Sequence, residues 1–85
     1  MLLLDFFSPN CTYCRQMELV LDDIEKEYKN KVSIKRIDAT KAPDLSSIYG
    51  IRSLPTLVLM QNGTEIKRST GSKTKAALRE FISLA

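Results

Sequence analysis

The stretch Leu2–Cys14, which reads LLLDFFSPNCTYC, decides the fold. Its first six residues form a nearly continuous apolar run that ends at Ser8–Asn10. Such a run predicts a central strand that is buried on both faces. Asp5 is the one charged residue in it, and a helical pattern begins at Cys11. The strand is therefore expected to lead almost directly into a helix.

A helix and a second strand follow. From Cys11 to about Lys29, apolar residues recur every three or four positions, which is typical of an amphipathic helix. These residues are Met17, Val20, Leu21, Ile24 and Tyr28. Val32, Ile34 and Ile37 then indicate a second strand.

The next segments predict a short helix and a hairpin. Pro43 suits the first position of a helix, and Gly50 suits the position just after its end. The dipeptide Asn62-Gly63 tolerates left-handed turn angles and separates residues 57–60 from residues 64–66. It therefore predicts a β-hairpin.

A final helix completes the pattern. Thr74 can cap it, and its apolar face consists of Ala77, Leu78, Phe81, Ile82 and Ala85. The order is then βαβαββα in an α/β domain with a mixed four-stranded sheet. We expect the first and last helices on one face of the sheet and the short middle helix on the other. We also expect residues 1–85 to form a single domain.

Composition excludes several classes of function. The chain has 85 residues, no His and a net charge of +3, with its basic residues spread among acidic ones. The lack of His argues against triad hydrolases and His-ligated zinc enzymes. Dispersed charge does not support a specific nucleic-acid site, and Lys29–Lys31 and Lys67-Arg68 are interpreted as solvated surface. No segment suits a membrane span or a signal peptide, so we expect no membrane association.

The two cysteines carry the chemistry. Cys11 and Cys14 stand one helical turn apart at a helix start, close enough to form a small disulfide. Free N–H groups and the helix dipole there favour a thiolate, so Cys11 is the expected nucleophile. Cys14 lies one turn further in and would resolve the mixed disulfide. Thr12 and Tyr13 between them tune the thiolate, and Arg15 adds a positive charge.

Two other interpretations of the cysteine pair remain open at this point. A zinc or iron–sulfur site would need a second chain, because this chain has no further Cys and no His. Alternatively, both cysteines could be inert and buried. A position after Pro-Asn exposes at least one of them and argues against the second interpretation.

Several motifs in order resemble the thioredoxin family. They are Asp5-Phe6, the pair Cys11 and Cys14, Tyr49–Arg52 before Leu54–Thr56, Asn62-Gly63, and Gly71 before the last helix. The resemblance covers nearly the whole chain, as a thioredoxin without the family's first strand and first helix. It implies a thioredoxin fold and a thiol–disulfide oxidoreductase that reduces protein disulfides.

The resemblance also implies roles for individual residues. Pro55 corresponds to the family's cis-proline, which presents the Leu54 backbone to a substrate strand. Asp5 corresponds to a buried carboxylate that accepts the Cys14 proton through water. Arg36 stands where thioredoxins usually carry Lys, and its permanent charge opposes a rise in the Asp5 pKa.

The expected substrate-binding residues are Leu54, Pro55, Tyr13, Asn10 and Gly71. Asn10 replaces the family's Trp, which reduces the apolar rim of the substrate-docking surface. Tyr13 occupies the second position between the cysteines, where glutaredoxins also carry Tyr. Leu19 replaces a helix-kinking Pro, which predicts a straighter helix.

The expected partners are protein disulfides and an electron donor. The donor is a flavin-dependent reductase by the thioredoxin resemblance, or glutathione by the glutaredoxin-like length and Tyr13. We expect a cytoplasmic monomer with no cofactor and no metal. The alternatives are a glutathione-dependent reductase and a dimeric zinc or iron–sulfur binding module.

Overall fold

The computed structural model describes residues 1–83 and contains one mixed four-stranded sheet. The strand order is β2-β1-β3-β4, with β1 parallel to β2 and antiparallel to β3, and with β3 antiparallel to β4. The element bounds are β1 Leu2–Phe7, α1 Thr12–Glu27, β2 Ser33–Asp38, α2 Pro43–Ile48, β3 Thr56–Gln61, β4 Thr64–Thr70 and α3 Lys75–Ser83. The predicted order βαβαββα and the mixed four-stranded sheet are confirmed.

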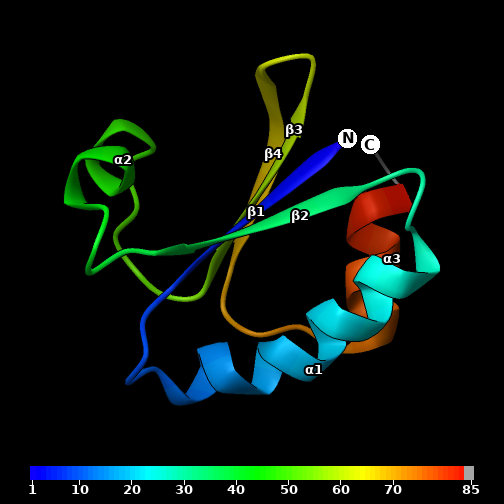
Figure 1. Cartoon of the computed structure of the whole chain (residues 1–85), viewed down its shortest axis with the longest axis horizontal. Coiled ribbons are helices and arrows are strands. Elements are labelled where there is room, and N and C mark those ends of the chain that lie inside the picture. The colour runs from blue at the N-terminus through cyan, green and yellow to red at the C-terminus, as the bar shows by residue number, and fades with distance from the viewer. Residues whose placement is uncertain (84–85) are drawn as a thin grey trace.

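The helices cover the sheet on two sides, with α1 and α3 on one face and α2 on the other (Figure 1). Alternation along β1 produces this division, because successive side chains of a strand point to opposite faces. Leu3 packs in the core beneath α1 and α3, whereas Leu4 and Phe6 pack in the core beneath α2. The predicted placement of the three helices is confirmed.

Some boundaries differ from those that the sequence predicted. Helix α1 starts one residue after Cys11, which serves as its N-cap, and ends two residues before Lys29. Strand β2 begins at Ser33, so Val32 precedes it. Strand β4 was expected over residues 64–66 but continues to Thr70 beside β3. This extension is polar because β4 is an edge strand, so it carries no apolar pattern.

The turn and cap residues behave as expected. Asn62 and Gly63 both have left-handed backbone angles, with φ of 54° and 79°. The Thr74 hydroxyl accepts a hydrogen bond from the Ala77 N–H at 3.1 Å and so caps α3. Helix α1 is continuous through Leu19. Ala85, expected on the apolar face of α3, lies outside the described residues.

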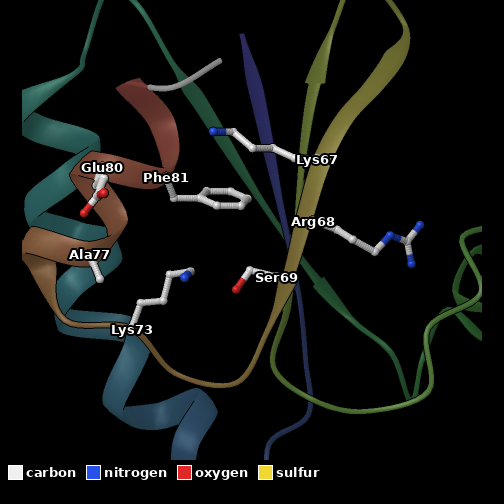
Figure 2. Close-up of a pocket in the computed structure, with 7 residues that line it drawn as sticks. All are labelled: Lys67, Arg68, Ser69, Lys73, Ala77, Glu80 and Phe81. Atoms are coloured by element: carbon white, nitrogen blue, oxygen red, sulfur yellow. The ribbon is translucent and has the colours of Figure 1, made fainter.

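A surface pocket of about 380 Å³ lies between β4 and α3 (Figure 2). It is on the α1 and α3 side of the sheet, at the edge strand. Within residues 1–83, no helix has both the length and the apolar character needed to cross a membrane.

Candidate active site

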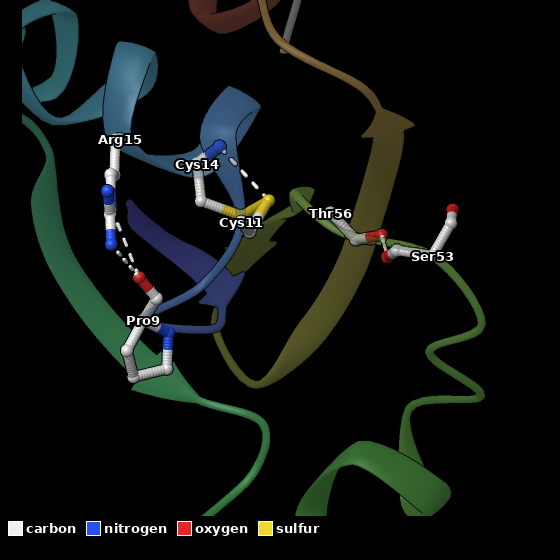
Figure 3. The surroundings of a disulfide bond; sticks show 6 residues. All are labelled: Pro9, Cys11, Cys14, Arg15, Ser53 and Thr56. Atoms are coloured by element: carbon white, nitrogen blue, oxygen red, sulfur yellow. Dashed lines mark hydrogen bonds between the residues drawn. A yellow bond between two sulfur atoms is a disulfide. The ribbon is translucent and has the colours of Figure 1, made fainter.

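The two cysteines form a disulfide at the start of α1 (Figure 3). Their Cα atoms are 5.1 Å apart. Cys11 is half-exposed, whereas only 3 % of the Cys14 surface is exposed. The two sulfurs therefore differ in access, and only Cys11 can be approached easily from solvent.

Cys11 caps the helix through its sulfur. It has extended backbone angles, and its Sγ accepts a hydrogen bond from the Cys14 N–H at 3.1 Å. Ser, Thr, Asp and Asn usually occupy this position because their side chains accept such a bond. Here a sulfur takes that place at the positive end of the helix dipole, and the first turn of α1 contains no acidic residue. Negative charge on Cys11 is stabilised by this geometry.

Arg15 anchors the loop in front of the disulfide. Its Nε and Nη2 donate hydrogen bonds to the Pro9 carbonyl oxygen at 3.1 and 2.8 Å (Figure 3). The first turn of α1 is thereby tied to the segment that enters it.

The segment around Pro55 lies beside the disulfide. The Leu54–Pro55 peptide bond is cis, Pro55 is buried and Leu54 is half-buried. The Thr56 hydroxyl donates to the Ser53 carbonyl oxygen at 2.6 Å (Figure 3). The Gly71 N–H donates to the Pro55 carbonyl oxygen at 2.9 Å. The expected cis-proline is present, and its segment is held by a side-chain hydrogen bond within it and by a backbone hydrogen bond from Gly71.

Asp5 is a buried carboxylate in the middle of β1. Its side chain is 3 % exposed, and Oδ1 has no hydrogen-bond partner within residues 1–83. Burial raises the pKa of Asp5 to about 6, Arg36 opposes this rise, and Glu18 adds to it. Asp5 points to the same face as Leu3, which packs beneath α1. Glu18 lies on α1 one turn after Cys14, so the carboxylate faces the helix that carries the cysteines.

Arg36 is next to Asp5 in the sheet but bonds elsewhere. The two residues are partners in the parallel register of β1 and β2. The Arg36 guanidinium instead donates to Asp22 Oδ1 at 2.6 Å, in a partly exposed ion pair with α1. Arg36 thus lowers the pKa of Asp5 through its charge, without a hydrogen bond to that carboxylate.

The structure gathers most of the expected site residues where β1 ends and β3 begins, at one end of the two inner strands. Cys11, Cys14 and the Pro55 segment lie together, with Asp5 on the strand that leads to them. Asn10, Thr12 and Tyr13 are exposed around the disulfide, and Tyr13 is 61 % exposed.

Sequence reasoning missed three contacts. Asp22 accepts the hydrogen bond of the Arg36 guanidinium, and the charge of Glu18 raises the pKa of Asp5. Met17 was expected only as a core residue, yet its Sδ accepts a hydrogen bond from the Lys73 N–H at 3.0 Å. The helical spacing of α1 placed Glu18 and Asp22 on adjacent turns and was the one available signal for two of these contacts.

A metal site is not evident in the part of the chain that the structure describes. Within residues 1–83, no group of three or more His, Cys, Asp or Glu side chains is arranged to hold an ion. The arrangement instead offers a redox-active pair of sulfurs, a buried carboxylate and an exposed backbone segment at a cis-proline. This set can carry out thiol–disulfide exchange.

Comparisons with known proteins agree with this chemistry. The family model for thioredoxin matches residues 1–84. The thioredoxin of Buchnera aphidicola is 35 % identical over 80 residues, which cover 94 % of this chain and 74 % of that protein. Thioredoxin 1 of a Nostoc species is 33 % identical over 80 residues, covering 94 % of this chain and 75 % of that protein.

A solved structure is also similar. The crystal structure of the germline-specific thioredoxin Deadhead from Drosophila melanogaster superposes with a TM-score of 0.92 and 25 % identity. The match covers 98 % of this chain and 78 % of that one. On the family match, the curated relatives and the disulfide at the start of α1, this chain belongs to the thioredoxin family and is a thiol–disulfide oxidoreductase.

Proposed function

We propose that this chain reduces disulfide bonds in other proteins, with Cys11 as the nucleophile and Cys14 as the resolving thiol. The unequal placement of the two sulfurs carries the proposal. Cys11 caps α1 at a half-exposed position, and Cys14 is buried one turn further along. A disulfide in an incoming protein meets Cys11 first.

The reaction transfers two electrons from the reduced chain to the substrate. The Cys11 thiolate attacks one sulfur of the substrate disulfide, that disulfide breaks, and the released substrate thiolate takes up a proton. The Cys14 thiolate then attacks Cys11 Sγ, the mixed disulfide breaks, and the second substrate sulfur leaves as a thiolate that takes up a proton. The chain is left with the Cys11–Cys14 disulfide. A partner reductase returns the two electrons.

Asp5 serves as the proton acceptor for Cys14. A carboxylate with a pKa of about 6 can take a proton near neutral pH, as a general base should. Its burial beneath α1 and its free Oδ1 support this role. Arg36 moderates it by favouring the charged form, and Thr12 and Arg15 modulate the thiolate from the first turn of α1.

The substrate binds as an extended segment beside the cis-proline. The half-buried Leu54 backbone offers the hydrogen-bonding groups that such a segment pairs with. Tyr13, Asn10 and Gly71 surround this position and supply side-chain and backbone contacts.

The proposed electron donor is a flavin-dependent reductase, because membership of the thioredoxin family favours this donor over glutathione. We propose that the chain acts in the cytoplasm as a monomer, as one domain over residues 1–85, with no cofactor beyond its own disulfide.

Two cysteine variants test the assignment. Cys11→Ser should reduce a model protein disulfide no faster than buffer, whereas Cys14→Ser should accumulate a covalent adduct with its substrate, visible by non-reducing gel and mass spectrometry. Equal behaviour of the two variants would contradict the roles.

A second measurement tests the activation of Cys11 directly. The rate of Cys11 alkylation by iodoacetamide, followed against pH in reduced Cys14→Ser protein, should give a thiol pKa below the ordinary ~8.5. An unshifted pKa would show that the start of α1 does not stabilise the Cys11 thiolate. Metal content of the purified protein tests the zinc or iron–sulfur alternative, which predicts one bound metal centre per dimer.

A further inference from the structure

The segment between β4 and α3 contacts both halves of the active site. It consists of residues 71–74, which belong to no helix or strand. At its first residue, the Gly71 N–H donates a hydrogen bond to the Pro55 carbonyl oxygen at 2.9 Å. Two residues later, the Lys73 N–H donates to Met17 Sδ at 3.0 Å. Met17 lies on α1, so this segment connects the cysteine helix with the cis-proline segment.

Met17 lies on the same side of α1 as the buried cysteine. It follows Cys14 by three residues, and residues with this spacing are neighbours on the surface of a helix. Met17 is fully buried, and Cys14 is 3 % exposed. Met17 packs in the core beneath α1 and α3, together with Leu3 of β1 and Leu78 of α3. A shift of the first turns of α1 therefore moves Cys14 and the Met17 sulfur together.

The hydrogen bond gives Met17 a polar contact inside an apolar core. A thioether sulfur is a weak acceptor, and buried methionines mostly serve to fill space. The Lys73 N–H lies outside the helices and strands, so no regular backbone ladder supplies its acceptor. The Met17 sulfur supplies one, whereas a leucine of similar size would supply none. Position 17 thus does more than pack.

Lys73 is also fixed to α3. Its ammonium group lies 5.4 Å from the centre of the Phe81 ring, and Figure 2 shows the side chain extending toward that ring. The face of an aromatic ring attracts a cation. The next residue, Thr74, caps α3 through the Ala77 N–H. The bond to Met17 therefore joins α1 to a residue that moves with α3.

The other end of the segment holds the cis-proline in place. Thr70, the last residue of β4, pairs with Thr56 in the register of β3 and β4. The hydrogen bond from Gly71 to the Pro55 carbonyl oxygen continues this pairing by one residue. Gly71 has a φ of 88°, a left-handed conformation that favours glycine. The position of Gly71 therefore helps to fix the backbone next to Leu54.

We infer that Met17 is a positioning residue for the reduction of protein disulfides. Through Lys73 and Gly71, it holds the cis-proline segment at a fixed place relative to the two cysteines. The inference rests on the proposed function, in which a protein substrate pairs with the Leu54 backbone while its disulfide meets Cys11. A small disulfide needs only Cys11, so its reduction does not depend on Met17.

Met17→Leu tests the inference, because leucine keeps a similar apolar volume and removes the acceptor. The reduced full chain is mixed with insulin, as a protein disulfide, or with hydroxyethyl disulfide, as a small one. Quenched flow with thiol labelling gives the second-order rate constant of its oxidation. The rate constant for insulin should fall about two- to tenfold, the range for the loss of one neutral hydrogen bond. The rate constant for hydroxyethyl disulfide should stay at the wild-type value.

Amide hydrogen exchange follows the connection itself. In Met17→Leu, the amides of Lys73 and Gly71 should exchange faster than in the wild type, because the first loses its acceptor and the second its support. The pKa of Cys11, measured by iodoacetamide alkylation, should stay unchanged. A shift in that pKa would mean that Met17 acts on the thiolate, and it would overturn the positioning role.

Met60→Leu is the matched control. It makes the same substitution in the core beneath α2, away from the segment that carries Lys73. Both rate constants and the exchange of both amides should remain at their wild-type values. A loss of insulin reduction equal to that of Met17→Leu would show that any methionine in the core has this effect, and it would overturn the inference.

The two substrates separate positioning from general stability. Equal decreases for insulin and hydroxyethyl disulfide in Met17→Leu would mean that Met17 only supports the packing of α1. An unchanged rate constant for insulin would mean that the hydrogen bond does not position the cis-proline segment. Either result would overturn the inference and leave the proposed function intact. Failure of the proposed function would appear in the wild type instead, as reduction of hydroxyethyl disulfide without reduction of insulin.

Discussion

The two faces of β1 differ in kind although they belong to one strand. On the face toward α2, Leu4 and Phe6 are buried in an entirely apolar core. On the face toward α1 and α3, Leu3 is followed by Asp5, which is equally buried and carries an oxygen with no described partner. A carboxylate in that position destabilises the fold in its charged form.

The difference indicates which face serves the reaction. The cysteines lie on α1, which covers the Asp5 face, so the costly residue is on the side where the redox chemistry takes place. The buried residues Leu4 and Phe6 on the α2 face of β1 contribute to packing alone. Variants on the two faces should therefore separate stability from catalysis, and the following experiments are ordered by the size of the expected effect.

The largest effect is expected on the purely apolar face. Phe6 is fully buried and its ring lies 5.6 Å from that of Tyr49. Phe6→Ala should lower the free energy of unfolding by about 3–5 kcal/mol, because a cavity remains where the ring was. Denaturant unfolding of the oxidised protein measures this loss.

A milder variant keeps this experiment decisive if Phe6→Ala fails to fold. Phe6→Leu leaves a smaller cavity and should cost less, while the pKa of Cys11 measured by alkylation stays unchanged. A shift in that pKa would show that the α2 face also contributes to the chemistry and would break the contrast between the faces.

A stabilisation of about 2–3 kcal/mol at pH 7 is expected for Asp5→Asn. The pKa of Asp5 is about 6 in the folded chain, against 3.8 when it is solvated. Between these values the folded state binds more protons than the unfolded state, so stability falls as pH rises from about 4 to about 6 and then levels off. Each pKa unit corresponds to about 1.4 kcal/mol.

The pH dependence distinguishes this effect from a change in packing. The gain from Asp5→Asn should shrink to about 0.6 kcal/mol near pH 4, where the wild-type carboxyl group is neutral in the folded state and about half ionised in the unfolded state. Glu25→Gln, at an exposed position on α1, is the matched control and should have little effect at either pH. A gain of equal size at pH 4 and pH 7 would exclude burial of charge as its cause.

The same variant should slow one step of the reaction. If Asp5 accepts the Cys14 proton, Asp5→Asn should prolong the lifetime of the mixed disulfide by about 10²-fold, the lower end of the range for a general base. Attack by Cys11 should change much less. Stopped-flow measurement of both steps tests this, and equal rates in wild type and variant would remove Asp5 from the mechanism.

Local signals in the sequence were enough for most of the fold. The apolar run before Cys11, the Asn62-Gly63 turn and the Thr74 cap each act through neighbouring residues, and each is found as expected. The end of β4 was not predictable, because an edge strand needs only backbone pairing with β3.

The sequence was enough to predict which positions form the candidate active site. It was not enough to predict which charged side chains contact one another in the folded chain. The sequence indicates solvated surface at Lys67, because the acidic residue Glu65 lies near it in the chain. Its position over the Phe81 ring depends on how α3 packs against the sheet. The hydrogen bond from Arg36 to Asp22 also depends on tertiary structure, because Arg36 lies on β2 and Asp22 on α1.

The smallest effect is expected on the pKa of Asp5 when Arg36 or its hydrogen-bond partner Asp22 is replaced. Arg36 neighbours Asp5 in the sheet but donates its hydrogen bond to Asp22. Arg36→Gln removes a charge that lowers the pKa of Asp5, so this pKa should rise above about 6. Asp22→Asn leaves the guanidinium free to turn toward Asp5, so the pKa should fall instead. Carboxyl NMR titration measures both shifts, each of about one unit or less. Shifts in the same direction would mean that Arg36 acts on Asp5 only through the position of α1, and the two faces of β1 would then differ in packing rather than in charge.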